Sequence, residues 1–322
     1  MGEAQHMPVD TRRSRPPKLS DVTGGAQRRQ VVVTSALAGE RLDKALAALS
    51  EDVSRTLARK AIANGGVFLG LDRCKVASRK VSPDDCLTIT WHPAGHAGRT
   101  YPLHIIHEDS TLVVVHKPAG QHVQGTAQGD AGTLVVSLQK RFGAATQLAH
   151  RLDAPASGLV IAGRDSGTVA ELMTCFREHT VTRAYLAVVL GVPRAGECRL
   201  PLARDGRRMR IAARDEPEAK PAHTDVEVLW QGEGKALVRA QLHTGRMHQV
   251  RAHLSGLGAP IVGDRLYGAE RAPRLCLHAV DLGVSLPGRD KLTLHTPPPE
   301  DFWMTAELPE EARKAIEEPP RG

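Results

Sequence analysis

Apolar positions in the early part of the chain recur at helical spacing, which predicts two short helices. The first pattern starts at Leu42, and the second runs to Ile62. Ser54 is placed to cap the second helix at its N-terminus, and Gly65-Gly66 to end it. Short strands are expected to follow. We therefore predict a small α/β domain over residues 30–92.

From Tyr101 onward, short apolar runs of strand length predominate and are interrupted by two helical patterns. The helical patterns are Leu134–Phe142 and Ser166–His179. The expected strands are Leu112–Val115, Leu159–Ala162, Val181–Gly191, Asp225–Trp230, Ala236–Leu242 and Leu275–Leu282. We therefore predict a second, larger domain over residues 101–304. Two domains agree with a chain of 322 residues and a usual size of about 150 residues per domain.

The remaining segments lack apolar periodicity. Residues 1–29 carry six basic and three acidic side chains, and we interpret them as a disordered basic arm. Residues 93–100, with Pro93 and Gly98, are expected to form a linker. Residues 305–322 form an acidic, proline-containing tail.

Charge and composition narrow the class of partner. The net charge is +7 and the isoelectric point is about 9.3, which favours an anionic partner such as nucleic acid. Aromatic residues make up 3% of the chain, which argues against binding by rows of stacked rings. No apolar run approaches the roughly 18 residues of a membrane span, so a cytoplasmic protein without a membrane partner is expected. Five cysteines without a Cys-x-x-Cys pair predict free, mostly buried thiols.

The segment His150–Leu159 has the strongest chemical character in the chain. Asp153 follows Arg151 in a turn of small residues and precedes the apolar run Leu159–Ala162. A partly desolvated carboxylate beside a guanidinium could remain ionised and reactive. The same residues would also suit a structural turn, in which a local ion pair caps a buried strand.

A second segment, Leu242–Leu254, combines histidines with arginines at the predicted end of a strand. Three histidines suggest a metal site, but His248 and His253 are five residues apart. A zinc-binding helix places its histidines four residues apart with a glutamate between them, and this segment has neither feature. We therefore expect no metal here.

These segments resemble the motifs of the RluA-type pseudouridine synthases, which modify RNA. The motifs are His150-Arg151-Leu152-Asp153 with Ser157-Gly158-Leu159, then Lys117-Pro118-Ala119-Gly120, Arg183-Ala184-Tyr185, Thr244-Gly245-Arg246-Met247-His248-Gln249-Val250-Arg251 and Gly263-Asp264-Arg265-Leu266-Tyr267-Gly268. Ala154, Ala156 and Met247 stand where the family often has Lys, Thr and Thr. The resemblance covers residues 39 to 303, with the motifs in the family's order.

The resemblance implies an α+β fold, in which a mixed, mostly antiparallel sheet with flanking helices holds a central cleft. It implies that Asp153 is the catalytic carboxylate, that Arg251 pairs with it, and that Tyr185 stacks on the target base. Arg151 would fill the space left by a flipped nucleotide, and His150 would assist substrate binding. The resemblance also implies that the reaction, the conversion of uridine to pseudouridine, requires no cofactor and no metal.

The N-terminal domain resembles the αL RNA-binding motif of ribosomal small-subunit protein four. The shared pattern is Arg41-Leu42-Asp43-Lys44, Ser54-Arg55 and Gly65-Gly66-Val67, whereas Leu69-Gly70-Leu71 departs from it. The resemblance implies that Arg41, Lys44 and Arg55 contact RNA phosphates. These basic residues would equally suit a solvated helix face.

Several alternatives stay open from sequence. The substrate is large-subunit ribosomal RNA or transfer RNA, and Asp153 acts as a nucleophile or as a base that generates a glycal intermediate. An RNA-binding protein that has lost activity would explain Ala154, Ala156 and Met247. A hydrolase would need a second carboxylate near Asp153. The basic cluster from Arg204 to Lys220 is an exposed hairpin near RNA or a solvated loop, and a monomer is assumed.

Overall fold

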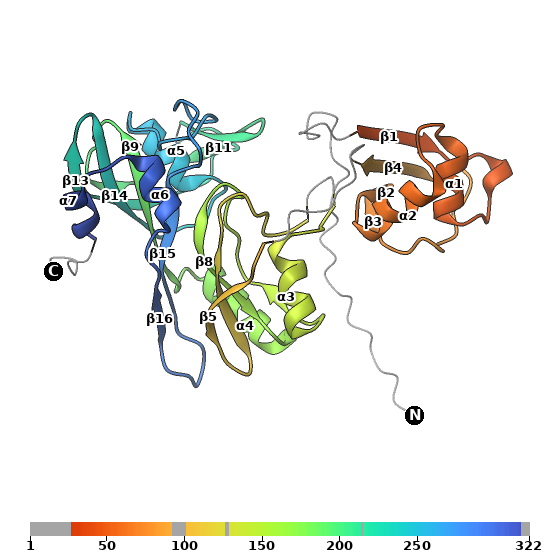
Figure 1. Ribbon diagram of the computed structural model, residues 1–322, viewed down its shortest axis with the longest axis horizontal. Coiled ribbons are helices and arrows are strands. Elements are labelled where there is room, and N and C mark those ends of the chain that lie inside the picture. The colour runs from red at the N-terminus through yellow and green to blue at the C-terminus, as the bar shows by residue number, and fades with distance from the viewer. Residues whose placement is uncertain (1–26, 92–100, 126–128, 214, 317–322) are drawn as a thin grey trace. The chain divides into compact units, whose positions relative to one another are not determined.

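The computed structural model describes residues 27–91, 101–125, 129–213 and 215–316, which form two compact units (Figure 1). The N-terminal unit also includes Gln124–Val136, which the sequence had placed in the second domain. That prediction was wrong because the backbone N–H of Asp130 donates to the carbonyl of Asn64 (2.7 Å) and its carboxylate pairs with Lys75. The predicted linker 93–100 and the arm up to residue 26 lie outside the described residues.

The N-terminal unit packs two helices on a four-stranded antiparallel sheet with strand order β1-β4-β2-β3. Its elements are β1 (Gln27–Val32), a 3-10 turn η2 (Ser35–Leu37), α1 (Leu42–Leu49), α2 (Arg55–Ala63), β2 (Val67–Leu69), β3 (Asp72–Cys74) and β4 (Cys86–Trp91). Leu42, Leu46, Ile62 and Leu87 are buried between the helices and the sheet. The predicted pair of helices followed by short strands is confirmed.

The ends of α2 follow the predicted signals. The Ser54 hydroxyl accepts a hydrogen bond from the backbone N–H of Leu57 (3.1 Å), which satisfies a free donor of the first turn. Gly65 adopts φ +70° just after the helix, a conformation that side chains with a Cβ rarely adopt. The predicted boundary of the basic arm at residue 29 was wrong, since β1 begins at Gln27. Its polar residues suit a strand at the sheet edge, most of whose side chains are exposed.

The second unit is built on one ten-stranded sheet, of which eight strands follow the order β10-β13-β14-β9-β15-β8-β6-β5. Its strands are β5 (His104–Glu108), β6 (Leu112–Lys117), β7 (Gln147–Leu148), β8 (Ser157–Gly163), β9 (Thr182–Leu190), β10 (Gly196–Cys198), β13 (Thr224–Gly232), β14 (Lys235–Leu242), β15 (Leu277–Val284) and β16 (Leu292–His295). The pair of β8 with β15 is parallel and the other pairs are antiparallel. The predicted mixed, mostly antiparallel α+β fold is confirmed.

Helices flank this sheet. They are α4 (Ser166–Arg177), α5 (Gln249–Gly256), α6 (Glu300–Ala306) and α7 (Glu310–Lys314), while α3 (Leu134–Phe142) spans the boundary of the two units. Figure 1 shows α4 beside β8, where Leu172 packs with Leu159 and Ile161 in one apolar core. Helices α5 and α6 lie at the other end of the unit, near β9 and β14.

Two local features refine the sequence predictions. The basic segment forms a two-stranded hairpin of β11 (Leu202–Asp205) and β12 (Arg208–Ile211), as predicted, although Arg214 lies outside the described residues. The tail boundary at residue 304 was wrong, because α7 buries Ala312 and contacts β13. A single small apolar residue within an acidic stretch gave no helical periodicity from which to predict this contact.

The cysteines are free, as predicted, and all except Cys86 are buried. Within the described residues, none of the helices combines the length and the apolar character that crossing a membrane requires.

Candidate active site

A cavity of about 160 Å³ in the second unit brings together several of the predicted residues. It is lined by the turn before β8, by β9 and by the segment that leads into α5. The lining residues are Arg151, Leu152, Asp153, Ala156, Arg183, Tyr185, Leu242, Gly245, Arg246, Met247, His248, Gln249, Val250, Arg251 and Leu277. Among the described residues of this lining, Asp153 is the single acid.

A buried lysine donates hydrogen bonds to the backbone of the turn that carries Asp153. Lys117, at the end of β6, is fully buried, and its Nζ donates to the carbonyls of Ala154 (3.1 Å) and Ala156 (2.6 Å). It also donates to the carbonyls of Pro118 and Gln121, both at 2.9 Å. Burial lowers the pKa of Lys117 to about 7, although the charge of Asp153 acts in the opposite direction. Lys117 thus fixes the backbone on which Asp153 stands.

The strand that follows the turn also constrains it. Gly158, in β8, adopts φ +118°, and a Cβ at this position would collide with the backbone of Ala279 in the parallel strand β15. Only glycine allows the two strands to approach this closely, five residues after Asp153. The glycine of the Ser-Gly pair therefore has a packing role.

Arg251 joins Asp153 to a second acid. Its Nη1 donates to Asp153 Oδ2 (3.2 Å), while Nε and Nη2 donate to the two carboxylate oxygens of Asp264 (2.7 and 2.8 Å). Burial acts to lower the pKa of Arg251, but the hydrogen bonds and charge of Asp264, with those of Asp153, outweigh it and raise the pKa. The side chains of Arg251 and Asp264 are 7% and 1% exposed. A bidentate ion pair out of solvent thus orients the arginine that contacts Asp153.

His248 lies on the other side of Asp153. It is the N-cap of α5 and adopts a left-handed conformation with φ 52°, which is uncommon for a residue with a Cβ. Its Nε2 lies 3.8 Å from Asp153 Oδ1, and its Nδ1 lies 3.1 Å from the Tyr267 hydroxyl. Burial lowers the pKa of His248, which favours the neutral ring.

Tyr185 and Arg183 reach the cavity from β9, two residues apart and therefore on one face of the strand. Tyr185 is 7% exposed, and burial raises the pKa of its phenol to about 12. The guanidinium of Arg183 lies 5.3 Å from the centre of the Phe176 ring, and burial lowers its pKa. Among the described residues, its buried Nε has no hydrogen-bond partner.

Comparison with known proteins assigns this arrangement to a family. Residues 111–256 match a family model described as RNA pseudouridylate synthase, and residues 40–86 match the S4 domain model. The ribosomal large subunit pseudouridine synthase D of Zymomonas mobilis is 32% identical over 284 residues, which cover 80% of this chain and 90% of that protein. The chain belongs to the RluA-type RNA pseudouridine synthases.

Further relatives agree with this assignment. An uncharacterized RNA pseudouridine synthase of Bacillus subtilis is 33% identical over 85% of this chain and 95% of its own length. The solved structure of human RNA pseudouridylate synthase domain containing 1 is 28% identical, with a TM-score of 0.54 over 63% of this chain and 86% of that chain. RNA pseudouridine synthases are isomerases that act on RNA, and this chain pairs that fold with an S4 domain.

Arg151 and His150, which precede Asp153 in the synthase motif, lie in different surroundings. Arg151 is exposed and lines the cavity. His150 is not among the lining residues; its ring stacks on Phe176 at 4.7 Å, and its Nε2 accepts the backbone N–H of Ile161 (3.1 Å). We therefore assign His150 a packing role rather than the predicted contact with substrate.

This packing makes His150 a source of acid sensitivity. Burial lowers the pKa of His150 to about 3, whereas the unfolded chain binds a proton near pH 6.5. Between these values the unfolded state holds more protons, so the unfolding free energy is expected to fall as the pH falls. We expect His150→Gln, which keeps an acceptor, to reduce this slope by about one proton. Denaturant unfolding from about pH 4 to about pH 7 measures the slope, and an unchanged slope would contradict the assignment.

The predicted RNA-contacting residues of the S4 domain have internal partners. Arg41 and Arg55 donate to Asp43, at 3.0 and 3.1 Å, and Lys44 pairs with Glu40 at 2.8 Å. Asp43 is fully buried; burial acts to raise its pKa, but the hydrogen bonds from both arginines lower it overall. One carboxylate thus sets the positions of two arginines whose side chains are 38% and 55% exposed.

Sequence reasoning left four residues of the site without a role. Lys117, Arg183 and Asp264 were quoted as parts of motifs, and His248 was considered as a metal ligand. The motif positions of Lys117 and Asp264 were a usable signal. Lys117 contacts the carbonyls of Ala154 and Ala156, 37 and 39 residues away, and Asp264 pairs with Arg251, 13 residues away, so spacing alone could not identify these partners.

Proposed function

We propose that this chain converts specific uridines of large-subunit ribosomal RNA to pseudouridine. The observation that carries the proposal is Asp153, the single acid among the described residues of the cavity lining, in contact with Arg251 and facing a cavity that Tyr185 also lines. Ribosomal RNA is favoured over transfer RNA because curated relatives are named ribosomal large subunit pseudouridine synthase D. A two-carboxylate hydrolase is disfavoured, because Asp264 is buried in its pair with Arg251.

In the proposed mechanism the target uridine is flipped into the cavity, and Arg151 fills the space it leaves in the RNA. Tyr185, kept neutral by its raised pKa, stacks on the uracil. Asp153 then acts on the ribose, either by attack at C1′ or by removal of the C2′ proton. The bond from C1′ to N1 breaks, and a bond from C1′ to C5 forms as the Asp153–C1′ bond breaks or the C2′ proton is returned, according to the route. C5 then loses its proton and N1 gains one, so that the product is an isomer of uridine. Both routes require an ionised carboxylate, which Arg251 stabilises.

Arg183 is proposed to bind a phosphate of the flipped nucleotide. Within the part of the chain that the structure describes, Arg183 forms no ion pair with an acid, and a phosphate would supply acceptors for its partly buried guanidinium. Among the described residues, Arg183 Nη2 donates a long hydrogen bond to the carbonyl of Thr244, at 3.4 Å. The guanidinium therefore has donors left for an anion in the cavity.

We expect Arg183→Met to lower kcat/KM by about 10- to 100-fold through loss of a charged hydrogen bond. The slope of log affinity against log salt concentration should fall by about one. Arg177→Met, which removes an exposed arginine from α4, is the matched control. Steady-state kinetics and RNA titrations at several salt concentrations measure both effects. An unchanged salt slope would argue against a phosphate contact.

The function is tested by mapping pseudouridines in total RNA from cells that lack this protein. Complementation with the wild type should restore the lost sites, whereas Asp153→Asn should not. Sites lost from large-subunit ribosomal RNA support the proposal, and sites lost from transfer RNA alone would correct the substrate. If no site changes, an RNA-binding role without catalysis becomes the better account.

A further inference from the structure

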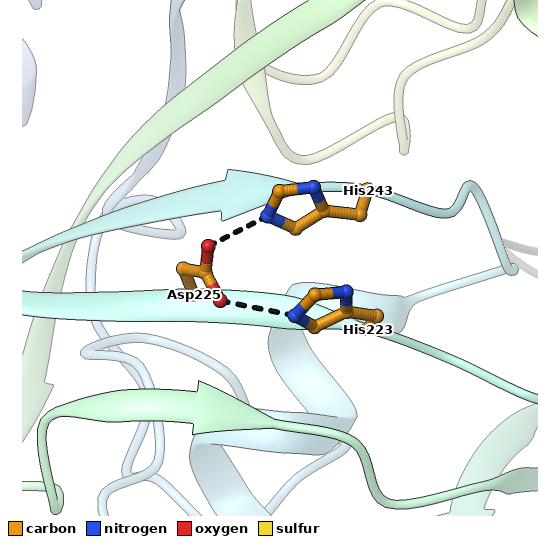
Figure 2. A group of neighbouring side chains, drawn as sticks. All are labelled: His223, Asp225 and His243. Atoms are coloured by element: carbon orange, nitrogen blue, oxygen red, sulfur yellow. Dashed lines mark hydrogen bonds and ion pairs between the residues drawn. The ribbon is translucent and has the colours of Figure 1, made fainter.

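A compact group of side chains of the kinds that can hold a metal ion lies outside the cavity lining. It consists of His223 just before β13, Asp225 in β13 and His243 just after β14 (Figure 2). The Nε2 atoms of His223 and His243 lie 3.0 and 2.6 Å from the two carboxylate oxygens of Asp225. One ligand atom from each residue lies within 4.8 Å of the others.

The register of the sheet explains this grouping. Thr224 pairs with Leu242, so the preceding His223 lies opposite the following His243, whose N–H donates to the carbonyl of His223 (3.1 Å). Asp225 is two residues from His223 and therefore on the same face of the strand. Glu197 of β10 is the register partner of Asp225 on its other side.

Glu197 adds a second carboxylate to this face. Its Oε1 lies 3.8 Å from His223 Nε2, and Arg199 holds the carboxylate by two hydrogen bonds of 2.8 and 3.0 Å. Three adjacent strands therefore present two imidazoles and two carboxylates to one small volume. The two imidazole rings are stacked, with centroids 4.1 Å apart.

We propose that His223, Asp225 and His243 bind a divalent transition-metal ion, with Zn²⁺ as the favoured occupant and Glu197 as a fourth ligand. Imidazole nitrogen with carboxylate oxygen is a usual ligand set for Zn²⁺, which accepts four ligands. To bind through Nε2, each neutral ring carries its proton on Nδ1, and metal bonds replace the two hydrogen bonds to Asp225.

The site is distinct from the catalytic residues but lies next to them in sequence. Leu242 and Gly245, on either side of His243, line the cavity, whereas the three ligands do not. The proposal does not depend on the RNA substrate, and metal binding can be measured without turnover.

The test is a Zn²⁺ titration of untagged, full-length protein in competition with a chromophoric chelator. We expect one ion per chain, and at least about a 100-fold weaker affinity in Asp225→Asn and His243→Gln. The glutamine keeps a hydrogen-bond donor for Asp225, and circular dichroism checks that both variants are folded. His295→Gln is the control, because His295 also pairs with an aspartate, Asp281 (2.7 Å), outside this group.

Titration with Co²⁺ distinguishes metal binding at this site from metal binding by cysteine thiols. A spectrum without a band from sulfur ligands supports the proposal, since the three residues supply only nitrogen and oxygen. Absence of stoichiometric binding would overturn it. So would equal affinity in the wild type and His243→Gln, or a Co²⁺ spectrum that shows cysteine ligands.

Discussion

Asp153→Asn is expected to lower kcat by at least about 10⁴-fold, the usual scale for removing the group that does the covalent or proton-transfer chemistry. Asparagine has nearly the same shape, so it can still accept a hydrogen bond from Arg251 Nη1. It has no charge with which to attack C1′ or to remove the C2′ proton. The turn should keep its position, because Lys117 binds the carbonyls of Ala154 and Ala156 and not the side chain of Asp153.

The measurement is release of tritium from RNA labelled at C5 of uridine, since that hydrogen leaves when the new carbon–carbon bond forms. Enzyme in excess over RNA reports the chemical step, and a separate binding assay should show unchanged or slightly tighter RNA affinity after loss of a negative charge. Asp290→Asn, at an exposed position, serves as the control. Activity of Asp153→Asn within tenfold of the wild type would remove Asp153 from the mechanism.

The local part of the site could be predicted from sequence because it depends on neighbouring residues. The turn with Asp153 and the strand after it are encoded by small residues followed by an apolar run, and the structure has β8 from Ser157 to Gly163. The Ser54 cap and the Gly65 stop of α2 are of the same kind. Each signal acts within a few residues, where backbone preferences decide the outcome.

Contacts across the sheet could not be derived in this way. Asp153 and Arg251 are 98 residues apart, and only the family resemblance joined them before the structure did. The contacts of Lys117 with the carbonyls of Ala154 and Ala156 depend on how β6 meets the turn before β8, which no periodicity encodes.

The proximity of His223 and His243 could have been predicted from the sequence. Asp225–Trp230 and Ala236–Leu242 were predicted as consecutive strands, and a short connection between antiparallel strands places their outer ends together. His223 and His243 flank those ends. The spacing of histidines within one segment relates His248 to His253 but carries no information about residues that face one another across the hairpin.

The second large effect is expected at the buried pair of Arg251 and Asp264. Asp264→Asn removes one of the two charges that compensate the guanidinium, and loss of one member of a buried ion pair typically destabilises a fold by about 3–5 kcal/mol. Arg251→Met should destabilise at least as much, because it leaves the Asp264 carboxylate buried without its partner. Both variants should lose most of their activity, because Arg251→Met removes the contact with Asp153 and Asp264→Asn removes the ion pair that orients Arg251 toward Asp153.

The double variant separates stability from catalysis. In Arg251→Met with Asp264→Asn, neither buried charge remains, so its unfolding free energy should exceed that of Arg251→Met alone. Its activity should stay as low as that of Arg251→Met, because the contact of Arg251 with Asp153 is still absent. Denaturant unfolding and tritium release, measured on all four proteins, complete the cycle. If stability and activity recover together in the double variant, Arg251 acts only through the fold, and its contact with Asp153 contributes nothing to the chemistry.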